Sequence, residues 1–125
     1  MRARATGKIP ERHLDTEYIC MYIRGMNDMQ WTRQGVDFAC DEKKQQLNLH
    51  KHGVDLLDAS TAFFDPCCLS FFDTEHNEME DRHQLLAKMT NGKLVFVVYT
   101  VRNDVVRLIS ARKAQKKEAQ IYEQQ

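Results

Sequence analysis

The chain has 125 residues and a mass of 14.7 kDa, a length typical of one domain. Equal numbers of basic and acidic residues, 18 of each, give a formal net charge of zero, and 42% of residues are hydrophobic. The longest apolar run, residues 94–99, is far shorter than the ~20 residues of a membrane helix, and no apolar segment follows the basic start as in a signal peptide. From these two features we expect a soluble, cytoplasmic protein and neither a membrane-spanning nor a secreted one.

Charge is segregated along the chain although the total is zero. Residues 102–117 contain six basic side chains and a single acid, whereas residues 73–81 contain five acids and no Lys or Arg. A basic segment of this kind indicates a polyanionic partner.

Four cysteines are present, and none forms a C-x-x-C pair. Adjacent Cys67 and Cys68 would form a strained disulfide, so all four are expected to be reduced thiols in the cytoplasm. A zinc site at Cys67 and Cys68 with nearby histidines is the alternative, but the spacing fits no common ligand pattern.

Residues 1–35 are polar and lack a sustained apolar period. Their single apolar patch is short, and Met21, Met26 and Met29 each offer an alternative start of translation. We therefore expect an extension that has little fixed structure or is not translated, followed by one domain at residues 36–125.

A strand and a capped helix are expected at the start of this domain. Residues 36–40 alternate weakly between apolar and polar, as a short strand does. Asp41 is expected to cap a polar helix that runs to about Lys51, since its lysines and glutamines are good helix formers. Gly53 ends it, because glycine readily adopts the positive φ of a helix terminus.

The following segment predicts a second helix, a strand and a loop. Residues 54–64 carry apolar side chains at helical spacing and predict an amphipathic helix. Asp65-Pro66 ends it, because the residue before a proline avoids the helical region. Residues 67–72 are apolar and aromatic and predict a strand, and the acidic residues 73–81 predict a loop.

A hairpin is expected next. Residues 83–89 predict a strand, and Asn91-Gly92 is the strongest short hairpin signal in the chain. The continuous apolar run within residues 93–100 is typical of a central strand buried on both faces.

The remaining residues complete an α+β pattern. Asn103-Asp104 predicts a turn, residues 105–110 the last strand, and residues 111–123 a closing helix rich in Ala, Lys, Gln and Glu. The order indicates an α+β fold in which an antiparallel β-sheet meander packs with two N-terminal helices and a C-terminal helix.

Five blocks of residues follow one another in this domain. They are Lys44-x-x-x-Asn48-x-x-Lys51-His52-Gly53-Val54, Phe64-x-Pro66, Glu80-x-Arg82, Val98-Tyr99-Thr100-x-Arg102 and Arg107-Leu108-Ile109-Ser110-Ala111-Arg112. In this order and spacing they resemble the BrnT family of toxins from bacterial type II toxin–antitoxin systems, over residues 36–123. The extension before Val36 has no counterpart in that family, while Cys40 replaces its usual tryptophan and Ala87 its usual glycine.

The resemblance implies a RelE-like fold and an endoribonuclease toxin that cleaves RNA and inhibits translation. It also implies a BrnA-type antitoxin as partner, which would neutralise the toxin and link it to operator DNA. RNA cleavage of this kind uses the 2′-hydroxyl to attack the adjacent phosphorus, and a protein assists by alignment and charge stabilisation, with no metal or cofactor required.

Three arginines are the first candidates for catalysis under this resemblance, because guanidinium groups give paired hydrogen bonds to phosphate. Arg82 and Arg107 are expected on strands, with Arg107 on the open face of the sheet. Arg112 is expected to open the last helix, where backbone N–H groups add to an anion site. We expect these three groups to converge on one hollow.

His52 is the candidate for proton transfer, because imidazole exchanges protons near neutral pH; it could instead only cap its helix. Lys51, Tyr99, Arg102 and Lys113 are candidates for substrate binding. For Lys51 the alternative is a solvated side chain, and for Tyr99 it is the end of a core strand.

Two other functions fit the same fold. One is a gyrase poison, as in ParE-like members of the superfamily, which lack the basic catalytic face. The other is a non-enzymatic, antitoxin-binding co-repressor. The three arginines favour the ribonuclease.

Overall fold

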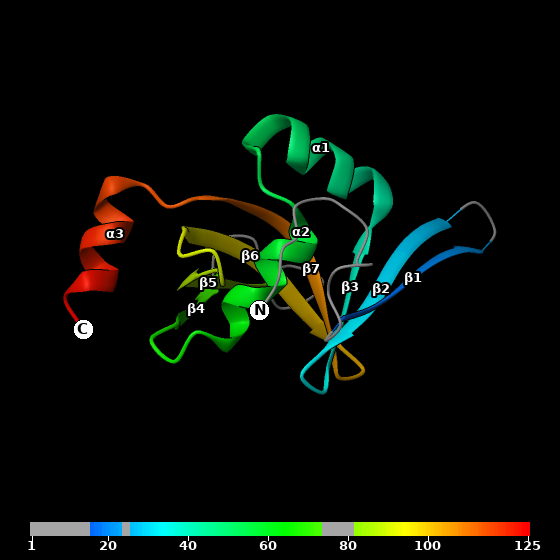
Figure 1. Ribbon diagram of the computed structural model, residues 1–125, viewed down its shortest axis with the longest axis horizontal. Coiled ribbons are helices and arrows are strands. Elements are labelled where there is room, and N and C mark those ends of the chain that lie inside the picture. Colours follow the sequence, from blue (N-terminus) through cyan, green and yellow to red (C-terminus); the bar gives the residue numbers. More distant parts are fainter. Residues whose placement is uncertain (1–15, 24–25, 74–81) are drawn as a thin grey trace.

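The computed structural model describes residues 16–23, 26–73 and 82–125. Within these residues a seven-stranded sheet has the order β1-β2-β3-β7-β6-β5-β4 (Figure 1). Its neighbours are antiparallel except β3 and β7, which run parallel. The strands are β1 (Thr16–Ile23), β2 (Met26–Arg33), β3 (Val36–Asp41), β4 (Leu69–Asp73), β5 (Arg82–Lys88), β6 (Leu94–Arg102) and β7 (Val105–Lys113). The helices are α1 (Glu42–His52), α2 (Leu56–Ala59), the 3-10 helix η2 (Ser60–Phe64) and α3 (Lys116–Glu123).

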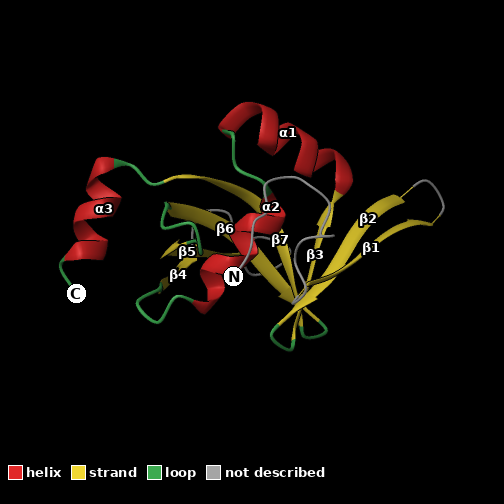
Figure 2. Cartoon of the chain, in the orientation of Figure 1, coloured by secondary structure: helices red, strands yellow, loops and turns green. Residues whose placement is uncertain are grey.

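The α+β class is confirmed, and Figure 2 shows the helices outside the single sheet. The loop expected at residues 73–81 lies almost wholly outside the described residues. Both predicted turns are present: β5 and β6 flank Asn91-Gly92, and Asn103 and Asp104 adopt φ of 50° and 66° between β6 and β7.

The segment before Val36 differs from the expectation of little fixed structure. β1 and β2 form an antiparallel hairpin, and β2 pairs with β3. Met29 and Trp31 of β2 are buried, and the Trp31 ring stacks on Phe38 at a centroid distance of 5.8 Å. Trp31 Nε1 also donates a hydrogen bond to Ser60 Oγ at 3.0 Å. The apolar periodicity was too short to indicate this strand, because only alternate residues of β2 face the core. The boundary at residue 36 and the translation of residues 1–35 stay predictions.

Helix α1 begins and ends as predicted. Asp41 accepts a hydrogen bond from the Lys44 backbone N–H at 3.1 Å, and Gly53 ends the helix with a φ of 70°. The helix packs mainly on β7 and on the adjoining ends of β2 and β3.

Asn48 of α1 closes an open strand edge. β3 pairs with β7 only as far as Arg107, so the edge of β7 beyond that point lacks a strand partner in β3. Asn48 Nδ2 donates to the Ala111 carbonyl at 2.8 Å, and Asn48 Oδ1 accepts from the Ala111 N–H at 3.0 Å. Nδ2 also donates to the Val54 carbonyl at 2.8 Å. This buried amide therefore replaces one residue of a neighbouring strand.

The single helix predicted at residues 54–64 is two short helices, α2 and η2. Ser60 Oγ donates to the Leu57 carbonyl and Thr61 Oγ1 to the Asp58 carbonyl, at 2.6 and 2.7 Å. Such side-chain bonds to carbonyls three residues earlier favour the tighter 3-10 geometry. The chain leaves the helical region at Asp65, as expected.

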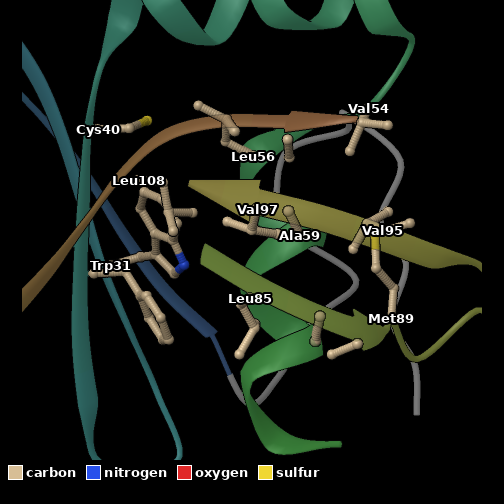
Figure 3. Packing of buried hydrophobic residues seen from close by; sticks show 14 of the residues in the cluster. Trp31, Cys40, Val54, Leu56, Ala59, Leu85, Met89, Val95, Val97 and Leu108 are labelled. Carbon is tan, nitrogen blue, oxygen red and sulfur yellow. The ribbon is translucent and has the colours of Figure 1, made fainter. Parts of the chain in front are cut away.

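The hydrophobic core lies between α2, η2 and one face of the sheet. Val95 and Val97 of β6 and Leu85 of β5 point toward α2, where Leu56 and Ala59 are buried (Figure 3). β6 is not buried on both faces as predicted, because Phe96 and Val98, which alternate with the buried valines, are only half-buried. The half-buried side of β6 therefore belongs to a second, more accessible face.

The prediction that the last strand ends at Ser110 and that Arg112 opens a helix was wrong. β7 continues to Lys113, because Ala111, Arg112 and Lys113 pair with β6. Helix α3 begins three residues later, where Gln115 and Glu118 form a capping box. The antiparallel ladder outweighs the local preference of alanine and lysine for helix.

Candidate functional site

The face of the sheet opposite the core carries most of the basic strand residues. Val97 and Tyr99 of β6 lie on the core face, so Val98 and Thr100 lie on the opposite one. We call this opposite side the arginine face; its polar residues include Arg82, Thr100, Arg102, Arg107 and Arg112, according to strand register.

A β-bulge in β7 brings its arginines to the same face. Tyr99 pairs with Leu108 and Val98 with Ser110, which leaves Ile109 as an extra residue in β7. An extra residue reverses the alternation of side chains beyond it. Arg107 and Arg112 would otherwise point to opposite faces, since they are five residues apart.

A hollow of about 420 Å³ lies on the arginine face. Its lining joins the start of α1 to residues of four strands: Asp41, Lys44, Arg82, Thr100, Arg102, Arg107, Leu108 and Ile109. Four cationic side chains against one carboxylate favour an anionic ligand there.

Arg107 is held at the hollow by Asp28 of β2. Arg107 Nη2 and Nη1 lie 2.8 and 3.2 Å from the two carboxylate oxygens of Asp28, a bidentate ion pair. The hydrogen bonds that Arg107 donates to Asp28 raise the pKa of Arg107 above its ordinary value, although partial burial acts against this. The guanidinium is therefore both charged and fixed in orientation.

Thr100 supplies an unpartnered polar atom at the same place. Its side chain is only 2% exposed, and Oγ1 has no hydrogen-bond partner within the residues that the structure describes. A buried hydroxyl without a partner is costly, so such groups commonly mark a place where a ligand or water binds. Thr100 is one of the residues that line the hollow, so this unpartnered hydroxyl lies beside it.

Arg112 does not reach the hollow. Its guanidinium lies 4.4 Å from the Phe96 ring centroid and forms a bidentate pair with Glu118 of α3, at 2.8 and 2.9 Å. Its β6 partner, Phe96, stands four residues from Thr100, the partner of Arg107, which places the two arginines about 13 Å apart along the sheet. Two of the three expected arginines, Arg82 and Arg107, therefore converge, and Arg112 docks α3.

The other predicted residues, except Arg102, also lie away from the hollow. His52 and Lys51 are at the far end of α1, about 12 Å from Lys44 along the helix axis. Lys113 is exposed at the end of β7. None of these three is among the lining side chains, so nothing in the geometry supports their predicted roles, which stay predictions.

Tyr99 points to the core face. Its ring stacks on His83 at a centroid distance of 5.2 Å and meets the edge of Phe63 at 4.9 Å. Its hydroxyl is 3.0 Å from Ser70 Oγ. This position fits the alternative reading of Tyr99 as the end of a core strand.

Sequence reasoning missed three residues at or beside the hollow. Lys44 and Thr100 stand in the blocks that carried the family resemblance, but neither was assigned a role. Asp28 precedes the resembling region, and no local pattern marks it. Only the pairing of β2 with β3 and of β3 with β7 brings Asp28 near Arg107.

The described residues contain no metal site built from cysteines or other metal-binding side chains. Cys40, Cys67 and Cys68 are free thiols, and burial raises the pKa of Cys40 to about 12. Residues 26–73 and 82–125 contain no group of three or more His, Cys, Asp or Glu side chains placed to hold a metal ion. In the same part of the chain no helix is both long and apolar enough to cross a membrane.

Comparison with known proteins points to one family. A family model described as "Ribonuclease toxin, BrnT, of type II toxin-antitoxin system" matches residues 40–118. Among solved structures, the ribonuclease toxin BrnT of Brucella abortus is 24% identical, with a TM-score of 0.48, and the match covers 62% of this chain and 94% of that one. No curated protein sequence matches the chain.

Proposed function

Because the chain belongs to the BrnT family of ribonuclease toxins from type II toxin–antitoxin systems, we propose that it is a metal-independent endoribonuclease that binds the scissile phosphodiester in the hollow on the arginine face. The observation that carries this proposal is that Lys44, Arg82 and Arg107 line the same hollow as Thr100, whose buried hydroxyl has no partner in the described residues. The hollow is large enough for a nucleotide-sized ligand.

The chemistry we propose is attack of the RNA 2′-oxygen on the adjacent phosphorus, which forms a 2′,3′-cyclic phosphate as the bond to the 5′-oxygen breaks. Solvent water takes the proton of the 2′-hydroxyl and supplies one to the leaving 5′-oxygen. Negative charge grows on the non-bridging oxygens as the new P–O bond forms. Arg82 and Arg107 stabilise that charge by hydrogen bonds, and Thr100 Oγ1 donates a further one. Catalysis is then mainly electrostatic stabilisation and alignment.

Arg112 has a different part in this proposal. It lies on the same face as Arg107 but about 13 Å away, so it contacts the RNA backbone beyond the scissile bond. Although Arg112 pairs with Glu118, its side chain is still 30% exposed.

Family membership supports the wider setting. We propose a RelE-like fold, inhibition of translation in the cytoplasm, and neutralisation by a BrnA-type antitoxin that connects the toxin to operator DNA. No feature of the described residues favours a gyrase poison or a purely non-enzymatic co-repressor over the nuclease.

The test is cleavage of single-stranded RNA by the purified protein and by Arg107→Ala, with Lys93→Ala as a control. Lys93 is exposed in the β5–β6 connection and does not line the hollow. Arg107→Ala should lower the cleavage rate by about 10²- to 10³-fold, as loss of one preorganised donor does. Lys93→Ala should cleave at the rate of the unsubstituted protein.

Two solution conditions test the mechanism further. EDTA should leave the rate unchanged, and RNA affinity should fall with salt with a log–log slope of about −0.7 per phosphate contacted. Intact RNA with the unsubstituted protein, or equal rates for it and Arg107→Ala, would reject the nuclease proposal. Loss of cleavage in EDTA would reject its metal-free form.

A further inference from the structure

An ion pair joins the N-terminal hairpin to the hollow. Asp28 is on β2 and Arg107 is on β7, so their contact passes over the intervening strand β3. Asp28 precedes the residues that match the family model, 40–118, whereas Arg107 lies within them. Figure 1 shows the hairpin of β1 and β2 beside β3, at the edge of the sheet.

The residue beneath this contact explains how it forms. Ala39 of β3 is in register with Arg107, and Asp28 is in register with Asp41. Residues in register share a face of the sheet, so Ala39 lies on the arginine face. Its methyl group is small enough for the Arg107 side chain to extend across β3, and Ala39 is only 2% exposed.

The geometry of the pair leaves Arg107 able to bind a second anion. A guanidinium has five N–H donors, and Asp28 engages the outer edge formed by Nη1 and Nη2. The edge formed by Nε and one Nη has the same spacing and suits two phosphate oxygens. A carboxylate on one edge therefore orients the other without removing the charge, since arginine stays protonated.

We propose that Asp28 is a positioning residue, which fixes the Arg107 guanidinium so that its remaining edge faces the phosphodiester in the hollow. The inference rests on the proposed function. Under this proposal the N-terminal hairpin of β1 and β2 is part of the active site, although the hairpin lies outside the residues that match the family model. Lys44, Arg82 and Arg102 keep the hollow cationic while Asp28 and Asp41 offset part of the charge.

A double-mutant cycle tests this role. Asp28→Ala and Asp28→Asn are made in the unsubstituted protein and in Arg107→Ala, and Asp28→Glu tests rescue. Asp37→Asn is the matched control, because Asp37 lies on β3 and accepts a hydrogen bond from Thr32 at 2.7 Å. Three quantities are measured: kcat and KM for RNA cleavage, and Kd for a single-stranded RNA made uncleavable by 2′-O-methylation.

We expect Asp28→Ala and Asp28→Asn to lower kcat/KM by about 10- to 100-fold and to raise Kd for the methylated RNA by a smaller factor, because a misplaced guanidinium binds the phosphate less well and stabilises the transition state less. In the Arg107→Ala background the same changes should have no further effect on kcat/KM or Kd, because the residue that Asp28 acts through is gone. Asp28→Glu should recover part of the loss, and Asp37→Asn should behave as the unsubstituted protein does.

Other results would overturn the proposal. Equal losses in both backgrounds mean that Asp28 only stabilises the fold, and a faster Asp28→Ala enzyme means that the pair inhibits Arg107. If the unsubstituted protein binds the methylated RNA but cleaves no RNA, the proposed function fails. The cycle in Kd then still decides the positioning role: coupling to Arg107 supports it and its absence overturns it. If that RNA is not bound at all, both proposals fail.

Discussion

Arg107 and Arg112 point to the same face of the sheet although they are five positions apart on β7. The extra residue Ile109 reverses the alternation between them. The two guanidiniums nevertheless have different carboxylate partners, Asp28 and Glu118, and the two residues stand about 13 Å apart along the strand backbone. Arg107 therefore belongs to the hollow, and Arg112 links helix α3 to strand β7.

Thr100→Val should separate ligand binding from stability. Valine removes a buried hydroxyl that has no partner in the described residues, so the free energy of unfolding should stay the same or rise slightly. RNA affinity should fall by about 5- to 10-fold, because one hydrogen bond to the phosphate is lost. Urea unfolding and RNA titration measure the two effects. Unchanged RNA affinity would show that the hydroxyl does not contact the ligand.

Asn48→Ala should destabilise the fold by about 2–3 kcal/mol, because it leaves buried backbone groups of Ala111 and Val54 without partners. Urea unfolding of the variant measures the loss. Gln46→Ala, at an exposed position of the same helix, is the control and should change stability by less than about 0.5 kcal/mol. Equal stability of the two variants would contradict the role of Asn48 at the strand edge.

Trp31→Ala should cost about 3–5 kcal/mol, as removal of a large buried aromatic side chain does. The change removes the stacking on Phe38 and the hydrogen bond to Ser60. Gln30→Ala on the exposed side of the same strand provides the comparison in thermal or urea unfolding. A loss below about 1 kcal/mol would mean that β2 adds little to the core.

Glu118→Gln should reduce the loss of stability in acid. The hydrogen bond from Arg112 lowers the pKa of Glu118 below its ordinary 4.5. A lowered pKa stabilises the fold above the unfolded value, and this stabilisation disappears as the pH falls through the folded value. The pair is partly exposed, so the effect should be less than about 1 kcal/mol.

The measurement is the free energy of unfolding at pH 7 and pH 3. Glu118→Gln should lose less stability between these values than the unsubstituted protein, whereas Glu123→Gln, an exposed position in the same helix, should lose as much. If Glu118→Gln has the same pH dependence as the unsubstituted protein, the Arg112 pair does not support docking of α3.

Local signals in the sequence predicted most elements of residues 36–125. The Asp41 cap, the Gly53 terminus and the two β-turns depend on residues within a few positions of one another. The same is true of the α+β class, which follows from the order of these elements. Errors arose where pairing outweighed local preference, as at Arg112, which the ladder with Phe96 keeps in β7.

The candidate site was predicted only in part. Three of the predicted residues line the hollow: Arg82, Arg102 and Arg107. The other five do not: Lys51, His52, Tyr99, Arg112 and Lys113. The type of each side chain indicated which residues could bind a phosphate, but it did not indicate which of them lie together in the folded chain. The bulge at Ile109 and the placement of Asp28 are settled by contacts between distant strands.

By itself, then, the sequence determined the local elements and the chemical character of the site, because both depend on neighbouring residues and on side-chain type. Only the tertiary structure decided that the N-terminal hairpin joins the sheet and that Asp28 reaches Arg107. The two residues are 79 positions apart, and their contact depends on strand order and register, which arise from packing of the whole sheet.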